Sequence, residues 1–217
     1  MMTKREVHEM VCEALGRELD PALERFGFQR HRRSVEYVRP VPDGEQRLCF
    51  FSENRPSDEP LAWARLHPQI RLSFAEVNRI ACELVGGQTG WIAGGDWTFT
   101  APVDLVIPRE FFTRWFIGDD RSIDSCLQSI WVSLETWIMP FLDEYSSIES
   151  FTVAYENADQ RFVWSHPLCL FVTAALIQQG EIQKAAAVLE KQMGKPAVRD
   201  RYATAFDYVD KLNSNGQ

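Results

Sequence analysis

Residues 67–74 of this chain read His-Pro-Gln-Ile-Arg-Leu-Ser-Phe. From Gln69 onward polar and apolar side chains alternate, which puts Ile70, Leu72 and Phe74 on one side of an extended segment. Successive side chains of a β-strand point to opposite faces of its sheet, so this pattern predicts a strand with one buried face.

Two further strands are predicted upstream, over residues 28–39 and 45–52. Residues 42–44, Pro-Asp-Gly, suit the turn between them, because Pro fixes φ and Gly permits a positive φ. Two neighbouring strands joined by a short turn form a hairpin, so we expect an antiparallel sheet.

Elements on either side of these strands complete the first half. Residues 1–25 carry apolar side chains three and four positions apart, which predicts a helix that covers the apolar face of the sheet. We expect Pro21 to kink or restart this helix and Gly27 to end it. Residues 75–84 predict a short helix, and residues 97–107 a possible strand interrupted by Pro102.

After Pro108 the apolar spacing becomes helical. A broad apolar stripe runs from Ile123 to Leu142, which predicts a central buried helix capped by Ser122 and kinked or ended by Pro140. The last 50 residues predict three helices, of which the first two form an αα-hairpin. We therefore predict an α+β fold. An N-terminal helix packs on an antiparallel sheet in residues 1–107, a mostly helical region follows in residues 108–217, and the two make one continuous body.

The five cysteines form no CxxC pair and no zinc-type spacing. We interpret them as reduced core residues of a cytoplasmic protein. The N-terminus lacks the apolar region of a signal peptide, and no apolar run is long enough to span a bilayer. The sequence predicts no membrane partner.

Most of the net charge of −8 lies in one segment. Residues 1–75 are neutral, whereas residues 119–159 hold nine acids and a single base, Arg121. Such a field speeds encounter with a basic partner and makes binding fall with salt. Five of these acids and two neighbouring aromatic residues are the predicted partner-binding residues: Asp119, Asp120, Asp143, Glu144, Glu149, Trp115 and Tyr145.

No arrangement in the sequence predicts a catalytic residue, a metal site or a cofactor. His166 and Cys169 lack a third group to orient them, and an apolar run around Cys169 raises the pKa of its thiol. His8 and Cys12 share one helix face, but zinc needs three or four ligands. The basic run at residues 30–33 sits in a chain of pI about 5.1, which argues against nucleic-acid binding.

A Gly-rich segment at residues 86–95 has neither a P-loop nor a dinucleotide-binding pattern. The alternative hypothesis is a small-molecule-binding module or enzyme. In it, the Gly-rich segment closes a cleft lined by Trp91, Trp97 and His67.

Several motifs resemble the DUF4304 family of bacterial domains of unknown function. They are Leu23–Arg30 with the arginine-rich strand to Tyr37, the strand at 48–52, the alternating strand at 70–74, and Trp137–Asp143. The resemblance covers about two-thirds of the chain and implies no catalytic residues. Some relatives look like immunity proteins beside bacterial toxins. We therefore expect a non-enzymatic, cytoplasmic protein-binding protein, immunity-like, that docks a basic partner protein through an acidic face.

Overall fold

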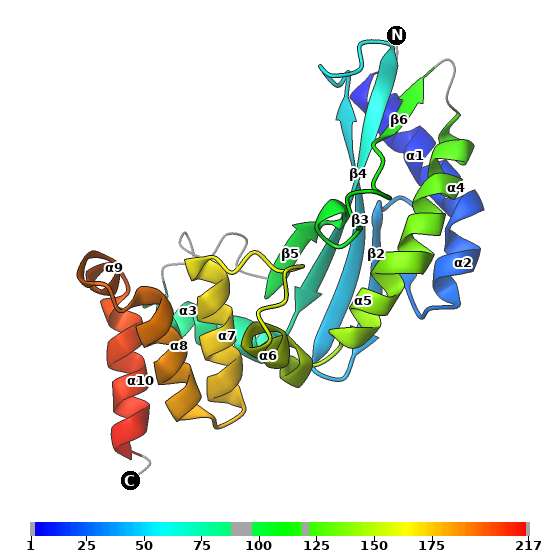
Figure 1. Cartoon of the computed structure of the whole chain (residues 1–217). Coiled ribbons are helices and arrows are strands. Elements are labelled where there is room, and N and C mark those ends of the chain that lie inside the picture. Colours follow the sequence, from blue (N-terminus) through cyan, green and yellow to red (C-terminus); the bar gives the residue numbers. More distant parts are fainter. Residues whose placement is uncertain (1–2, 88–96, 119–121, 216–217) are drawn as a thin grey trace. The chain divides into compact units, whose positions relative to one another are not determined.

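The structure is a computed structural model that describes residues 3–87, 97–118 and 122–215. It has the predicted α+β fold, with an N-terminal helix before the sheet and a helical C-terminal half (Figure 1). Among the residues that the structure describes, none of the helices combines the length and apolar character required to cross a lipid bilayer.

Six strands form one antiparallel sheet. In spatial order they are β1(Gln29–Arg30), β2(Glu36–Val41), β3(Gly44–Asn54), β4(Ala62–Ser73) and β5(Phe99–Pro102), and β6(Trp115–Gly118) also pairs with β4. β4 contains the alternating segment, and its even-numbered residues from Ala62 to Leu72 are buried while the odd-numbered ones are not. The sequence pattern therefore predicted the central strand and its buried face correctly.

The predicted turn between β2 and β3 depends on Gly44. A Cβ atom at this position would lie 1.9 Å from the carbonyl oxygen of Ser73. Only glycine allows the backbone of the turn to approach the end of β4 this closely.

The chain divides into two compact units that interleave along the sequence. Unit 1 comprises residues 1–41, 45–71 and 100–144, and unit 2 comprises residues 42–44, 72–99 and 145–217. The sequence predicted two consecutive regions, 1–107 and 108–217. No local pattern in the sequence shows that residues 108–144 belong to the same unit as the first strands.

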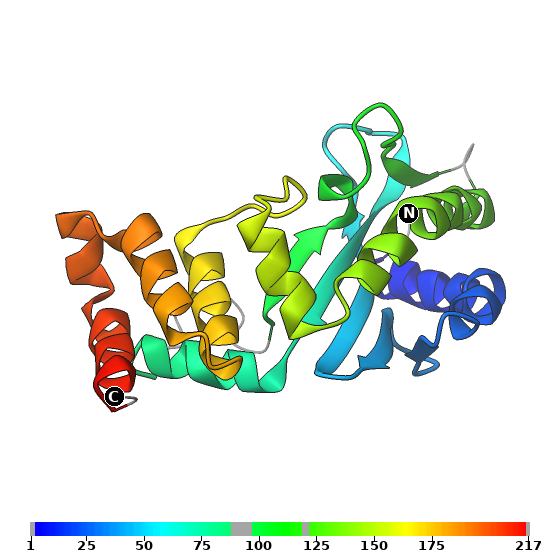
Figure 2. The ribbon, with the colours of Figure 1, turned by 60° about the horizontal axis from the view of Figure 1, so that its bottom comes forward.

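In unit 1, helices α1(Lys4–Glu18) and α4(Ile123–Ser133) pack against each other and lie on one face of the sheet (Figures 1 and 2). α1 begins with a capping box in which Thr3 and Glu6 satisfy each other's backbone N–H groups. Pro21 lies in the first turn of α2(Asp20–Glu24), and Gly27 follows with φ +81°, so the predicted restart and end of this region are confirmed.

Pro140 does not end the central helix. The chain passes through a π-helical turn, η3(Leu134–Ile138), into α5(Met139–Glu144), and the Met139 N–H donates to the carbonyl of Leu134 five residues back. Pro140 has no N–H to donate, so one wider turn next to it disturbs the helix less than a break would.

Unit 2 contains the remaining helices. They are α3(Ala75–Leu84), α6(Ile148–Glu156), α7(His166–Gln178), α8(Ile182–Met193), α9(Pro196–Arg201) and α10(Ala203–Asn215). α3 has the predicted bounds, and α7 packs against both α3 and α8, which confirms the αα-hairpin. The third predicted C-terminal helix is two, because the chain leaves helical geometry at Tyr202.

The predicted long strand over 28–39 is wrong at its centre. β1 ends at Arg30 and β2 begins at Glu36, so residues 31–35 form a loop. A loop forms here because the Arg30 guanidinium donates hydrogen bonds to two of its carbonyl groups, those of Arg32 and Ser34.

Candidate functional site: a hollow beside α1

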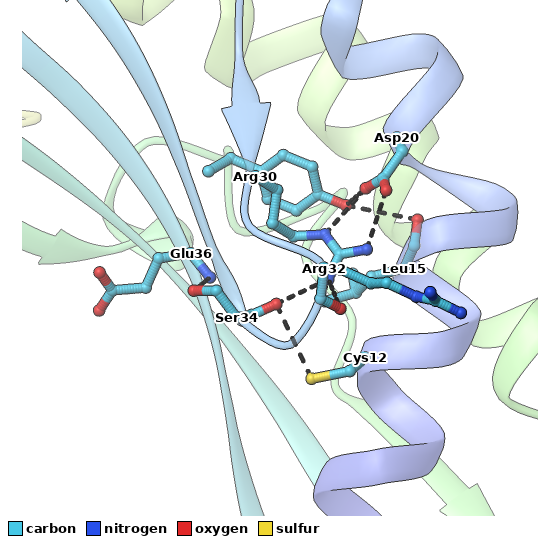
Figure 3. Close-up of polar contacts among 8 residues, drawn as sticks. Cys12, Leu15, Asp20, Arg30, Arg32, Ser34 and Glu36 are labelled. Carbon is cyan, nitrogen blue, oxygen red and sulfur yellow. Dashed lines mark hydrogen bonds and ion pairs between the residues drawn. The ribbon is translucent and has the colours of Figure 1, made fainter.

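The guanidinium of Arg30 is the centre of a polar network in unit 1 (Figure 3). Its Nε donates to Asp20 Oδ1 at 2.8 Å, and its Nη2 donates to Asp20 Oδ2 at 2.9 Å. The Arg30 side chain is only 2% exposed. A buried, two-pronged ion pair of this kind fixes both partners in one geometry.

The third nitrogen of Arg30 fixes the loop at residues 31–34. Its Nη1 donates to the carbonyl of Ser34 at 2.8 Å and to that of Arg32 at 3.2 Å. The thiol of Cys12, on α1, donates to the same Ser34 carbonyl at 3.8 Å. The loop has no strand partner, yet its backbone is held against α1 (Figure 3).

Asp20 is held from a second side by Tyr37. The Tyr37 hydroxyl lies 2.5 Å from Asp20 Oδ1 and 3.3 Å from the carbonyl of Leu15. Burial alone would raise the pKa of Asp20, but the hydrogen bonds from Arg30 and Tyr37 outweigh it and lower that pKa. Burial, followed by the Asp20 carboxylate, raises the pKa of Tyr37. The network is therefore ionised at Asp20 and neutral at Tyr37 at neutral pH.

Gly16 on α1 makes room for this network. A Cβ atom there would lie 3.2 Å from Arg30 Nη2 and 3.6 Å from Asp20 Oδ2. Because this Nη2 is itself held by its hydrogen bond to Asp20, contact at 3.2 Å leaves no space for a larger residue without a shift.

Beside the network lies a hollow of about 1030 Å³. One wall is α1 and the other is the loop at 31–34. The lining residues are Arg5, His8, Glu9, Cys12, Glu13, Gly16, Asp20, Arg30, Arg32 and Arg33. We call this hollow the α1 groove.

Some of the charged side chains that line the α1 groove form ion pairs and others do not. Arg5 pairs with Glu9 at 2.7 Å, and Arg30 pairs with Asp20. Arg32 and Arg33 are exposed, and no side chain in residues 3–87, 97–118 or 122–215 pairs with either guanidinium. After the internal pairs are removed, two arginines face one acid, Glu13, across the groove.

Cys12 and His8 do not make the groove a catalytic or metal site on their own. The His8 Nε2 lies 3.5 Å from the Cys12 Sγ, and burial raises the pKa of the thiol. A protonated thiol is a poor nucleophile and a poor metal ligand. The same holds for Cys169, whose pKa burial raises to about 11.

Four of the described acids in the segment at 119–159 form ion pairs, and one of these four, Asp143, is a predicted partner-binding residue. Asp143 lies 2.7 Å from the Arg39 guanidinium, and Asp124 pairs with Arg17. In unit 2, Asp159 pairs with Arg161 at 2.6 Å, and Glu156 pairs with Lys184 at 3.5 Å. Bases from outside the acidic segment therefore neutralise four of its nine carboxylates.

The remaining acids fall into two groups. Glu135, Glu144 and Glu149 are exposed, and no residue in the described part of the chain pairs with the carboxylate of Glu135 or Glu149. Asp119 and Asp120 lie outside the described residues.

The predicted aromatic anchors are not at the surface. Trp115 and Tyr145 are each 4% exposed. The Trp115 indole N–H donates to Ser129 Oγ at 3.2 Å, and Tyr145 donates to Asp159 and accepts from Arg161 at 2.8 Å. Both side chains hold neighbouring elements together, which is why they are buried.

The described residues of the alternative cleft do not belong to one compact unit. His67 belongs to unit 1 and Trp97 to unit 2, and Trp91 with most of the Gly-rich segment lies outside the described residues. His67 and Trp115, which the sequence placed in different hypotheses, line one cleft of about 350 Å³ in unit 1.

Sequence reasoning missed the α1 groove because its two walls are separated in the chain by the restarted helix and β1. A signal was present in the run Arg30-His31-Arg32-Arg33, which we had expected to alternate across a strand. Neither family models, nor curated proteins, nor solved structures match this chain.

Proposed function

We propose that this protein is a non-enzymatic protein-binding module whose α1 groove docks an acidic segment of a partner protein. One observation carries the proposal: the buried Arg30 fixes the backbone of the loop at 31–34, so that the unpaired Arg32 and Arg33 stand at the edge of a groove.

Two physical arguments support this function. A pre-fixed loop loses little conformational entropy on binding, so the free arginines bind more tightly than they would on a flexible loop. Arginine also presents a planar fork of donors that matches a carboxylate, and arginine is enriched at protein interfaces.

The dimensions favour a peptide segment over a small ligand. At about 1030 Å³ the groove is at the upper end of the size of small-molecule pockets. It lies along several turns of α1, from Arg5 to Gly16. An extended acidic segment would cover this length and reach both arginines.

The test uses a fluorescein-labelled decaglutamate peptide and fluorescence anisotropy at low and physiological salt. The variant Arg32→Glu/Arg33→Glu should weaken binding by more than about tenfold. A matched control, Arg25→Glu/Arg109→Glu, makes the same change in net charge at two exposed arginines outside the groove lining and should change binding by less than about twofold.

Equal losses in the two double variants would show that only net charge matters and would overturn the proposal. Circular dichroism of both variants checks that the fold is kept, which is expected because all four side chains are exposed.

A basic partner, docked through acidic residues in the manner of an immunity protein, is a second proposal. The observation that favours it is the exposure of Glu135, Glu144 and Glu149. We rank it second because ion pairs occupy four of the nine acids of that segment. With either partner, we also propose that the protein belongs to the DUF4304 family and is located in the cytoplasm.

A further inference from the structure

A second concave site lies in unit 1, where two strands share one edge of β4. β6 pairs with β4 up to Leu66, opposite Trp115, and β5 pairs with β4 further along. The cleft of about 350 Å³ forms at this junction. Its lining residues are Arg65, Leu66, His67, Pro68, Pro102, Val103, Asp104, Phe112, Arg114 and Trp115.

Arg65 is a fixed donor at this cleft. Its Nη2 donates to Glu53 at 2.6 Å, its Nη1 to Asp58 at 2.9 Å, and its Nε to the His67 Nε2 at 2.8 Å. A guanidinium has five N–H donors, so two remain for a ligand once these three are used.

His67 is held at the same cleft by two contacts of its Nε2. This nitrogen lies 2.8 Å from the Arg65 Nε and 3.2 Å from Glu53 Oε2, so that a donor and an acceptor both face it. These contacts fix the imidazole ring in the wall of the cleft.

Arg114 supplies a second guanidinium, which can exchange its ion pair for a contact with a ligand. It pairs with Asp58, and its side chain is 60% exposed. An exposed ion pair of this kind contributes little to stability, so the guanidinium can leave Asp58 for a ligand at low cost.

Apart from Asp104, the rest of the lining is apolar and includes an aromatic pair. Phe112 is half-buried and meets Trp115 edge to face, with ring centroids 5.6 Å apart. Pro68, Pro102 and Val103 add flat aliphatic surface. A few converging polar donors in an apolar cleft of this volume are the usual character of a small-molecule site.

We propose that this cleft binds a small organic acid: a carboxylate on a flat apolar body. Arg114 and the two remaining N–H groups of Arg65 bind the carboxylate, and the body lies against Phe112 and Pro68. Asp104, exposed in the lining, opposes the ligand's charge and limits its affinity.

The experiment titrates the full chain with benzoate and follows the tryptophan indole N–H signals by ¹H–¹⁵N NMR. The Trp115 signal is assigned with Ser129→Ala, because Ser129 accepts its hydrogen bond. Benzoate should shift this signal with an affinity at least about fivefold higher than those of benzyl alcohol, which lacks the charge, and acetate, which lacks the ring.

Three variants sharpen the result. Arg114→Gln should weaken benzoate binding at least about fivefold, and Asp104→Asn should strengthen it about twofold. Arg109→Gln, at an exposed arginine on the same loop outside the lining, should leave it unchanged. The proposal is overturned if benzoate binds no better than benzyl alcohol, or if Arg114→Gln and Arg109→Gln have equal effects.

Discussion

The acidic segment at 119–159 and the basic run at 30–33 carry their charge in opposite ways. In the acidic segment, Arg17, Arg39, Arg161 and Lys184 pair with four of the nine acids. In the basic run, one arginine is buried and holds the loop, and the two arginines after it have no ion-pair partner among the residues that the structure describes. Charge counted along a chain therefore does not predict where unpaired charge is presented.

The largest effect should come from Arg30. Arg30→Ala leaves Asp20 without its cation and removes the guanidinium donor of the Arg32 and Ser34 carbonyls, so we expect a loss of about 3 kcal/mol in the free energy of unfolding. Urea denaturation measures it. The matched variant Arg32→Ala removes an exposed, unpaired arginine and should change stability by less than about 0.5 kcal/mol. Similar losses of unfolding free energy in the two variants would contradict a structural role that is specific to Arg30.

The second effect compares the two charged regions by binding. Reversal of Asp143, Glu144 and Glu149 to Lys should change decaglutamate affinity by less than about twofold, while reversal of Arg32 and Arg33 lowers it more than about tenfold. Anisotropy with a decalysine peptide completes the comparison. A more than tenfold loss of decalysine binding in the triple variant, with a flatter salt dependence, would instead favour the basic-partner proposal.

The third effect concerns acid stability. The pKa of Asp20 is lowered in the folded protein, so its ionised form stabilises the fold above the unfolded-state pKa of about 3.9, and this contribution is lost as the pH falls through the folded-state value. Asp20→Asn should lower stability at pH 7 and reduce the loss between about pH 5 and pH 2. Urea midpoints across this range test it. Glu13→Gln, at an exposed and unpaired acid of the same groove, should reproduce the wild-type profile; an unchanged profile for Asp20→Asn would contradict the assignment.

The smallest effect is at Gly16. Replacing glycine by alanine inside a helix ordinarily stabilises it by about 1 kcal/mol. Here the new Cβ would lie 3.2 Å from the fixed Arg30 Nη2, so we expect Gly16→Ala to be neutral or destabilising by up to about 1 kcal/mol. Thermal denaturation measures it. If Gly16→Ala instead stabilises the protein by the full amount that is ordinary inside a helix, the network can move to make room for the new methyl group.

Local patterns predicted the parts of the fold that local physics determines. The alternation in β4, the bounds of α3 and the Ser122 cap of α4 all follow from side-chain periodicity and capping. The loop at 31–35 could not be found this way, because the carbonyls of Arg32 and Ser34 bind the side chain of Arg30 instead of a neighbouring strand. β6 was also missed: its four residues gain their partner from β4, about fifty positions earlier in the chain.

The candidate site was less predictable than the fold. The individual residues are recognisable in the sequence, since His8 and Cys12 share one predicted helix face and the arginines form one run. What the sequence did not contain was the pairing of Arg30 with Asp20, ten residues earlier, which decides that Arg32 and Arg33 are free. Ion pairing of this kind depends on the tertiary structure, and so does the placement of His67 and Trp115 in one cleft.

The π-helical turn at Leu134–Ile138 has a consequence for tolerance to insertions and deletions. Such a turn holds one residue more than an α-helical turn, and each residue advances a helix by about 100°. Removing one residue from this segment would convert it into an ordinary α-helical turn and would leave the residues after it facing nearly the same way. Phe141 and Leu142, both buried, would then still face the core, whereas the same deletion in an ordinary turn of α4 would rotate them by about 100°. This segment should therefore accept the loss of one residue far more readily than α4 does.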